Sequence, residues 1–551
     1  MRFSGPRPLR PPIVLAVDLS QPVADEPAAS PLARLVSVRR PSLRELVDTL
    51  TEAADDPQVQ SLLVRVEHPA RSWAHAEELR DVVAAFSRSG KPTLAHAQSL
   101  GEAGDGTLAY YVATAFDEVH LQPSGDLGLT GLAAVAPFVG ELLDKVGIVP
   151  QFGHRHEYKA AANTLTERGF TDAHREAVDR IVASHHEHLV AAIAAGRGVS
   201  HERAAELVDQ GPKGAAVALA DGLVDRLAYR DETVAAVKES AGRGARLMTL
   251  SGYRAARRLR ALRPRRRTTV ALIHGQGPIR VGRSRRSLLG ASMGSDSVVT
   301  GFQQAIRDRR VKAILFRVDS PGGSAAASDA ICRAVMRARE AGKPVVVSMG
   351  PVAGSGGYWV SMAADRIVAA PGTLTGSIGV VSGKLVTRGL GDRLGVTTDE
   401  AHRGRFALMF SSSQEFTVEQ RERMDAFLDR VYDEFVDRVA GARSLDRATV
   451  HQHARGRVWT GEDAAARGLV DELGGYRRAL ASVRELVGLK TDAPLRMRAL
   501  PRQSALQRLG VRQVDPEDLR ALGTAALDGL RGAGLRDGGI ADMPGWAASL
   551  R

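Results

Sequence analysis

The sequence predicts an α/β protein built from two tandem copies of one domain, each with a largely parallel sheet. Short apolar segments alternate with amphipathic helical segments along most of the chain, which is typical of a parallel sheet covered by helices. The chain has 551 residues, too many for one ordinary core. It also matches itself over most of its length, so we expect the same fold twice.

The internal match is clearest over a stretch of 22 residues. Residues 110–131 align without a gap on residues 358–379, with seven identities in 22 positions. A Gly-Lys-Pro turn at 90–92 matches another at 342–344, and each precedes an apolar segment that reads as a strand. The difference in residue number between matched positions falls only from 252 to 246 along the chain. A few short insertions or deletions therefore account for the whole alignment of the two copies. This pattern indicates a duplicated domain.

We expect four segments along the chain. They are a first domain at 1–245, an arginine-rich linker at 246–267, a second domain at 268–490 and a C-terminal tail at 491–551. The linker prediction rests on eight arginines between Arg254 and Arg267, which read as a solvated connection. The tail is rich in Ala, Gly, Arg and Leu, which predicts weak helices or a mobile end.

Composition excludes several classes of protein and site. Cys332 is the single cysteine, which excludes internal disulfides and cysteine-rich metal sites. No apolar run reaches the roughly 18 residues of a membrane-spanning helix, and residues 1–22 lack the cleavage site of a signal peptide. We therefore expect a cytoplasmic protein or one peripheral to the cytoplasmic membrane. The net charge of +12 would suit an anionic lipid surface, but few aromatic residues interleave with the arginines, so nucleic acid is not an expected partner.

The two copies differ where chemistry is expected. The second copy has Ser355 in a glycine-rich turn, where the first copy has Thr107. Conversely, the first copy has Lys159 where the second copy has Ala407. One copy thus retains a candidate nucleophile and the other a candidate base, which predicts a single composite site for each chain.

Ser355 lies between a predicted strand and a predicted helix. A serine at such a turn is either a helix N-cap or a nucleophile beside unpaired backbone N–H groups. A second glycine-rich turn, Pro-Gly-Gly-Ser at 321–324, follows another predicted strand. Its amides together with the Gly356 amide would form an oxyanion hole, although an ordinary helix start explains the turn equally well.

Lysine is rare in this chain, which gives each lysine more weight. Of the 75 basic residues nine are lysines, which leaves 66 arginines. Arginine cannot give up its proton, whereas a desolvated lysine can act as a base near neutral pH. Lys159 is the candidate base, and Lys384, 29 residues past Ser355, is its rival. A histidine base in a Ser-His-Asp triad is a further alternative that only the presence of histidines supports.

Four short motifs of the second copy carry a family resemblance. They are Val-Asp-Ser-Pro-Gly-Gly-Ser at 318–324, Ala-Gly-Ser-Gly-Gly-Tyr-Trp at 353–359, Leu-Thr-Gly-Ser-Ile-Gly at 374–379 and Gly-Arg-Val-Trp-Thr-Gly at 456–461. Together they resemble the signal peptide peptidase A family, also called protease IV, in its long tandem-repeat form. The resemblance covers about residues 10 to 490. It implies a ClpP/crotonase-type fold and peptide-bond hydrolysis with no cofactor and no metal.

Carried over by position, the resemblance also implies site residues. Ser355 would be the nucleophile and Lys159 the general base, with Ser377 hydrogen-bonding the lysine amine. The first copy has Leu129 in place of Ser377, which is consistent with the loss of a complete site there. Oxyanion and substrate contacts are implied for three glycines, Gly322, Gly323 and Gly356.

The resemblance leaves the substrate and two other functions open. The family is usually anchored in the membrane at its N-terminus, and this sequence departs from that. The expected substrates are therefore either signal peptides or other extended apolar peptides. The family also assembles into rings, which implies a homo-oligomer such as a tetramer. A crotonase-like acyl-CoA enzyme would use the paired amides without a serine nucleophile, and an inactive scaffold would keep only the fold. Intact Ser355, Lys159 and Ser377 argue against the scaffold.

Overall fold

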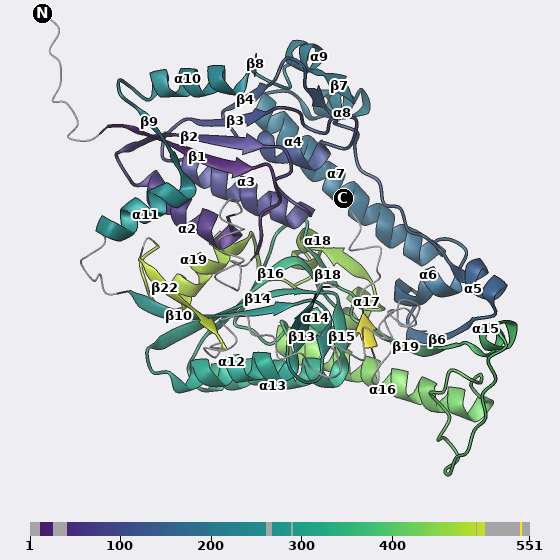
Figure 1. The fold of residues 1–551 in the computed structure, drawn as a ribbon. Coiled ribbons are helices and arrows are strands. Elements are labelled where there is room, and N and C mark those ends of the chain that lie inside the picture. The colour runs from purple at the N-terminus through teal and green to yellow at the C-terminus, as the bar shows by residue number, and fades with distance from the viewer. Residues whose placement is uncertain are drawn as a thin grey trace, which may run out of the picture.

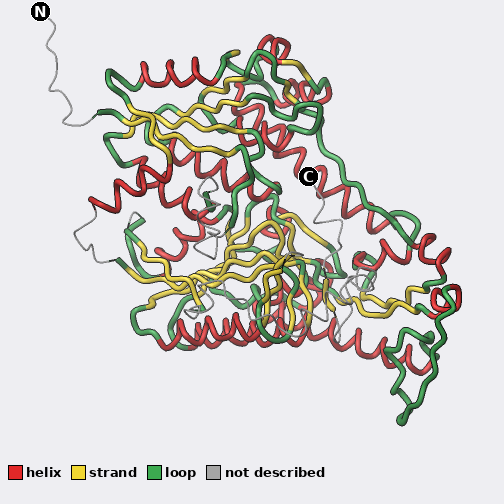
Figure 2. Tube along the Cα trace, in the orientation of Figure 1, coloured by secondary structure: helices red, strands yellow, loops and turns green. Residues whose placement is uncertain are grey.

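Two layers of strands, separated by helices, make up most of the molecule (Figure 2). The computed structural model describes residues 11–25, 41–260, 267–287, 290–491, 493–501 and 540–542. The upper layer in Figure 1 comes from the first copy and the lower layer from the second. Each layer contains one sheet, and the two sheets have corresponding strands.

The first copy forms a six-stranded sheet in the order β8-β4-β3-β2-β1-β9, and all neighbouring strands run parallel. The strands are β1 (Ile13–Leu19), β2 (Val59–Val66), β3 (Thr93–Ala97), β4 (Glu118–Leu121), β8 (Arg226–Leu227) and β9 (Arg246–Thr249). The longer helices are α2 (Leu43–Ala54), α3 (Trp73–Ser87), α7 (Asp172–Arg197), α8 (His201–Asp209), α10 (Arg230–Ser240) and α11 (Leu250–Arg260).

The second copy repeats this order strand for strand, as β21-β17-β16-β14-β10-β22, again in parallel. The strands are β10 (Thr268–Gln276), β14 (Val311–Ser320), β16 (Val345–Gly354), β17 (Arg366–Ala369), β21 (Glu472–Leu473) and β22 (Leu495–Leu500). The longer helices are α12 (Ser295–Arg307), α13 (Ala325–Glu340), α16 (Val418–Arg443) and α19 (Tyr476–Leu486). The expected tandem α/β architecture with largely parallel sheets is confirmed.

Both faces of the second sheet are buried, which explains its nearly continuous apolar strands. Along β14, Ala313 and Leu315 pack into one core, whereas Ile314 and Phe316 pack into the other. The first of these cores also contains residues of α2, α3 and α19, the helices that lie between the two sheets (Figure 1). The second contains residues of α12, α13 and α16 on the opposite face. A single hydrophobic core therefore joins the first domain to the second.

Residues 246–260 differ from the solvated linker that we expected. They form β9, which pairs with β1, and α11, which packs against the first domain. Tyr253 is buried in α11, and its hydroxyl donates to the Asp56 carboxylate at 2.9 Å. Arg254 forms an ion pair with Glu45 of α2. Arg254 and Arg257 therefore lie on the polar side of an amphipathic helix, and residues 261–266 lie outside the described part of the chain.

The second domain likewise extends beyond the expected boundary at residue 490. β22 adds to the edge of the sheet beside β10, as β9 does beside β1 in the first copy. Most of the expected tail, 502–539 and 543–551, lies outside the described residues, but one short strand of it, β23 (Ile540–Asp542), is described. No helix in the described ranges is both long enough and apolar enough to span a membrane.

A third sheet connects the two copies directly. Its order is β12-β13-β11-β15-β23-β19-β6. Its strands are β6 (Val149–Arg155), β11 (Ile279–Arg280), β12 (Arg285–Ser287), β13 (Gly290–Gly294), β15 (Gly322–Ser324), β19 (Val380–Val386) and β23. β6 belongs to the first copy and pairs antiparallel with β19 of the second, from Val149 opposite Val386 to Arg155 opposite Val380. This pairing places the segment of the first copy that precedes Lys159 against the second copy.

A buried ion network also holds the two copies together. Arg317 of β14 contacts the Glu78 carboxylate of α3 at 2.8 Å and the Asp25 carboxylate at 3.0 Å. Burial alone would lower the pKa of Arg317, but the two carboxylates outweigh it and raise the pKa. The Tyr476 amide of α19 also donates to Glu78, at 2.8 Å. Removing one member of such a network leaves buried charges without a partner.

We expect the Arg317→Ala variant to lose about 3–5 kcal/mol of unfolding free energy, because Glu78 would stay buried without its ion-pair partner and Asp25 would keep only His75, at 3.1 Å. Arg310→Ala is the control, since Arg310 pairs with Asp308 at the surface and its side chain is 74% exposed. Urea unfolding followed by circular dichroism measures both variants. Equal small losses in the two variants would contradict the structural importance of Arg317.

Candidate active site

Ser355 lies at the sharp turn between β16 and the short helix α14 (Gly356–Trp359). Its backbone has φ 54° and ψ −117°, a conformation that costs energy for a residue with a side chain. The Ser355 amide donates to the Gly376 carbonyl at 2.7 Å, which fixes the turn against β18 (Leu374–Gly376). A strained strand-to-helix turn of this kind presents a serine hydroxyl away from the sheet.

The Lys159 amine lies against this hydroxyl, although 196 positions separate the two residues. The amine nitrogen lies 3.0 Å from the Ser355 hydroxyl oxygen, and the amine donates to the Ser377 hydroxyl at 3.0 Å and to the Ser377 carbonyl at 2.9 Å. All three residues are fully buried. The candidate base is therefore in contact with both the candidate nucleophile and the candidate orienting group.

Lys159 reaches this position through β6 and through a close approach to Gly456. The pairing of β6 with β19 puts Arg155 opposite Val380, so the chain continues from there toward Ser377. A β-carbon at position 456 would lie 2.5 Å from the Lys159 β-carbon, closer than atoms approach. Gly456 also has φ +83° and donates its amide to the Ile378 carbonyl at 2.8 Å. Only glycine leaves room for Lys159 here.

The two glycine-rich turns also meet. A β-carbon on Gly356 would lie 3.1 Å from the Gly323 amide nitrogen, so these two amides are neighbours at the turn that carries Ser355. The Gly322 amide instead donates to the Ser320 hydroxyl at 3.2 Å. Gly323 has φ +146° and lies against the Ile279 backbone. Gly323 and Gly356 are thus better placed than Gly322 to offer amides to a substrate oxygen.

The rival bases have other partners. The Lys384 amine donates to the Met409 carbonyl at 2.9 Å and lies over the Phe416 ring, 4.3 Å from its centre. Burial lowers the pKa of Lys384, but its contacts connect it to the loop beyond β19. The His451 ring nitrogen Nδ1 lies 2.9 Å from the Tyr432 hydroxyl. Neither contact involves Ser355, whose hydroxyl contacts Lys159.

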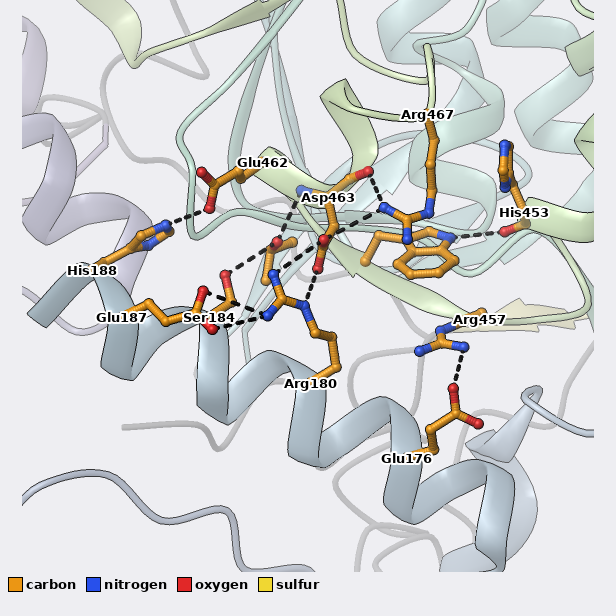
Figure 3. Close-up of polar contacts among 12 residues, drawn as sticks. Glu176, Arg180, Ser184, Glu187, His188, His453, Arg457, Glu462, Asp463 and Arg467 are labelled. Carbon is orange, nitrogen blue, oxygen red and sulfur yellow. Dashed lines mark hydrogen bonds and ion pairs between the residues drawn. The ribbon is translucent and has the colours of Figure 1, made fainter.

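Helix α7, which begins 13 residues after Lys159, is fixed to the second copy by a stripe of polar side chains (Figure 3). The stripe has a spacing of four residues, which puts its members on one face of the helix. Its members are Glu176, Arg180, Ser184 and His188, and their partners are Arg457, Asp463, Thr460 and Glu462. Arg457 lies between Gly456 and β20 (Val458–Thr460), and the other three partners lie in β20 and α18 (Gly461–Ala465). Sequence analysis missed this stripe, although its four-residue spacing is visible in the sequence.

His188 has a strongly shifted pKa within this stripe. Its ring nitrogens lie 3.2 Å from a Glu77 carboxylate oxygen and 2.8 Å from a Glu462 carboxylate oxygen. Burial alone would lower the pKa of His188, but the two carboxylates outweigh burial and raise the pKa to about 9. The imidazolium form of His188 therefore stabilises the contact between the two copies.

A serine hydroxyl on a strand-to-helix turn, hydrogen-bonded by a buried lysine amine, is typical of hydrolases that use a Ser–Lys pair. The family model of Peptidase family S49 matches this chain at residues 85–243 and 337–490. The chain therefore belongs to peptidase family S49, and it is a serine peptidase. The resemblance on which the sequence analysis relied is confirmed.

Relatives match the chain over most of its length. The chain is 31% identical over 500 residues to Protease 4 of Salmonella typhi. This alignment covers 86% of this chain and 78% of the relative. It is 29% identical over 468 residues to the chloroplastic serine protease SPPA of Arabidopsis thaliana. That alignment covers 84% of this chain and 68% of the relative.

Two solved structures are more distant in sequence and in overall superposition. A membrane-bound stomatin-specific protease, 15% identical, has a TM-score of 0.27 and covers 43% of this chain and 100% of its own. ClpP1 of Listeria monocytogenes, 14% identical, has a TM-score of 0.25 and covers 38% and 94%. Both scores are low, so the fold assignment rests on the sheets described above.

The stability of the protein should depend on pH through His188. A histidine whose pKa rises from 6.5 to about 9 on folding contributes fully below pH 6.5, and this contribution is lost as the pH rises toward 9. We expect the melting temperature of the wild type to fall more steeply between pH 6.5 and 9 than that of His188→Gln. Differential scanning calorimetry over this range measures both slopes. Identical slopes would show that His188 is not held as an imidazolium.

Proposed function

We propose that the chain hydrolyses peptide bonds through a Ser–Lys dyad to which each copy contributes one residue. Ser355 is the nucleophile and Lys159 is the general base. The observation that carries this proposal is the 3.0 Å hydrogen bond between the Lys159 amine and the Ser355 hydroxyl. A hydroxyl needs a base within hydrogen-bond reach before it can attack, and this amine meets that condition.

The first half of the reaction forms an acyl-enzyme. Burial disfavours the ammonium form of a lysine, and Lys159 is fully buried, which favours the neutral amine that this mechanism requires. Neutral Lys159 takes the Ser355 proton while the serine oxygen attacks the scissile carbonyl carbon. Ser377 orients the amine through its hydroxyl and its carbonyl oxygen. The amides of Gly323 and Gly356 stabilise the oxyanion of the tetrahedral intermediate.

The second half restores the enzyme. The intermediate collapses when the carbon–nitrogen bond breaks, and protonated Lys159 gives its proton to the leaving amine. Water then attacks the acyl carbon, with Lys159 again accepting a proton, and the carboxylic product leaves as the serine oxygen regains its hydrogen. No cofactor or metal enters this sequence of steps.

The substrates in this proposal are extended apolar peptides, signal peptides among them. Because Ser355 is fully buried, a folded protein surface cannot contact it, so we expect the substrate to be an extended chain. The similarity to enzymes named Protease 4 and SPPA supports peptides as the substrate class. An acyl-CoA enzyme would have no use for the lysine–serine hydrogen bond. A homo-oligomeric ring remains a prediction of the family resemblance.

Peripheral contact with an anionic membrane also remains a prediction, with less charge available than the sequence suggested. Arg254 is paired with Glu45, and Arg257 lies 3.5 Å from an Asp56 carboxylate oxygen. Two arginines of the cluster are therefore partly neutralised within the chain.

The proposal is tested with a matched pair of lysine variants. Lys159→Met and Ser355→Ala should each lower kcat/KM on a fluorogenic peptide with an apolar core by about 10³-fold or more. Lys384→Met, which removes the rival amine from another buried position, should keep most of the activity. The wild-type rate should rise with pH through one ionisation as the lysine amine loses its proton. Activity retained in Lys159→Met would refute the dyad.

A glycine variant tests whether the position of Lys159 matters as much as its chemistry. Gly456→Ala should push Lys159 away from Ser355 and lower kcat by about 100-fold, since small misplacements of a reacting group have effects of this size. Gly488→Ala is the control, because Gly488 also has a positive φ, +69°, but open space around it. Equal activities of the two variants would contradict the role of Gly456, and circular dichroism checks that both are folded.

A further inference from the structure

The strand that leads to the candidate nucleophile, β16, is irregular in its middle. Val318 of β14 lies opposite Met349 of β16. Two residues later along β14, Ser320 lies opposite Ala353. One residue of β14 therefore faces three residues of β16, 350–352, which we call the β16 bulge. Before the bulge β16 pairs with β17, and after it β16 pairs with β18, so the bulge redirects the strand shortly before the turn of the nucleophile.

Two charged side chains of β14 hold the two ends of the β16 bulge. The Arg317 guanidinium donates to the Met349 carbonyl, just before the bulge, at 3.0 Å. The Asp319 carboxylate accepts a hydrogen bond from the Val352 amide, the last amide of the bulge, at 3.3 Å. Gly350 leaves room for this side chain, because a β-carbon at position 350 would lie 3.0 Å from the Asp319 β-carbon. Side chains thus satisfy backbone groups where the regular strand pairing is interrupted.

The first copy has charged residues at the matching positions but a regular pair of strands. Arg65 and Glu67 of β2 correspond to Arg317 and Asp319 of β14. Arg65 donates to the Glu67 carboxylate at 3.0 and 2.9 Å, so these two side chains pair with each other. The pairing of β2 with β3 has no shift of register. Between these corresponding strand pairs, the bulge and the side chains that hold it therefore occur in the copy that carries the candidate nucleophile.

The side chains that hold the β16 bulge also belong to the ion network between the copies. Arg317 pairs with Glu78 and Asp25 of the first copy. Burial and then the negative charge of Asp25 raise the pKa of Asp319 to about 6, against the opposite effect of His75 and Arg317. At pH 8 Asp319 is therefore ionised, and an ionised carboxylate is a stronger acceptor for an amide than a neutral group.

We propose that Asp319 is a positioning residue for Ser355: its carboxylate, acting with Arg317, holds the β16 bulge in the shape that aims this serine at its base. The role of Ser355 as nucleophile rests on the function proposed above. Asp319 does not touch the substrate, and it acts through the Val352 amide and the backbone that follows. Because Arg317 is also paired with carboxylates of the first copy, docking of the two copies is linked to the shape of the nucleophile turn.

The test compares three substitutions at position 319 in the full chain. Asp319→Ala and Asp319→Leu both remove the acceptor, and leucine does so without leaving a cavity. Asp319→Asn keeps an oxygen that can accept from the Val352 amide. The matched control is Asp365→Ala, because the Asp365 carboxylate accepts from the Val345 amide at 2.8 Å, at the opposite end of β16. Circular dichroism identifies the variants that are folded at the assay temperature, and either of the first two suffices.

Steady-state kinetics on the apolar fluorogenic peptide at pH 8 give the first readout. Asp319→Ala and Asp319→Leu should lower kcat about 10- to 100-fold, as expected for a misplaced nucleophile, and change KM less than about twofold. Asp319→Asn should keep kcat within about threefold of the wild type, and Asp365→Ala should match the wild type. An unchanged kcat without the acceptor, or an equally low kcat in Asp319→Asn, would overturn the proposal. An equal loss in Asp365→Ala would also overturn it, because the effect would then be one of strand stability.

Hydrogen exchange followed by mass spectrometry gives a second readout that does not require catalysis. Peptic fragments that cover residues 350–355 should exchange faster in Asp319→Ala and Asp319→Leu than in the wild type and in Asp319→Asn, whereas fragments of β10 should not change. Unchanged exchange at 350–355 would overturn the proposal. If no protein hydrolyses the peptide, the wild type included, but this difference in exchange is found, the peptidase mechanism fails and the anchoring of the β16 bulge by Asp319 stands.

Discussion

The antiparallel pairing of β6 with β19 is the interaction on which the candidate site depends. Every residue of β6 has a partner on β19, so this short sheet segment sets the path of the first copy inside the second with a fixed register. Lys159 follows four residues later and meets Ser377 and Ser355 within hydrogen-bond distance. A slip of one residue would turn the side chains of β6 to the opposite face and carry the lysine away.

Other contacts support the pairing of β6 with β19. The stripe on α7 fixes the helix that follows Lys159, and Gly456 leaves the space into which the lysine backbone fits. Farther away, Arg317 ties β14 to α3 through two buried carboxylates. The site is thus held by one sheet segment, one helix and one glycine, on a pair of domains that share a core.

Much of this arrangement could be predicted from the sequence, because the two copies of the duplicated domain can be aligned with each other. The matching strands predicted two similar sheets, and the exchange of Thr107 for Ser355 and of Lys159 for Ala407 predicted one shared site. The structure brings Lys159 and Ser355 together. The third sheet could not be predicted, because its strands come from distant parts of the chain, and its two seven-residue strands, β6 and β19, belong to different copies.

The boundaries between domains were predicted less well. The arginines of 254–260 concealed an amphipathic helix, since charge dominates the local composition while only Leu250 and Tyr253 mark its buried side among the described side chains. β22 was missed because residues 495–500 alternate arginine with apolar residues and have no obvious counterpart until β9 is known. In both cases the tertiary partner, β1 or β10, decides the structure more than the local sequence does.

The distance in sequence between Lys159 and Ser355 has a consequence for the life of the chain. During synthesis the lysine is made first, and the serine follows 196 residues later. The sheet that carries the serine is complete only when β22 has joined β10, near residue 500. A growing chain that has not reached residue 355 has the amine but not the hydroxyl, so it cannot assemble the pair while the first copy is being made.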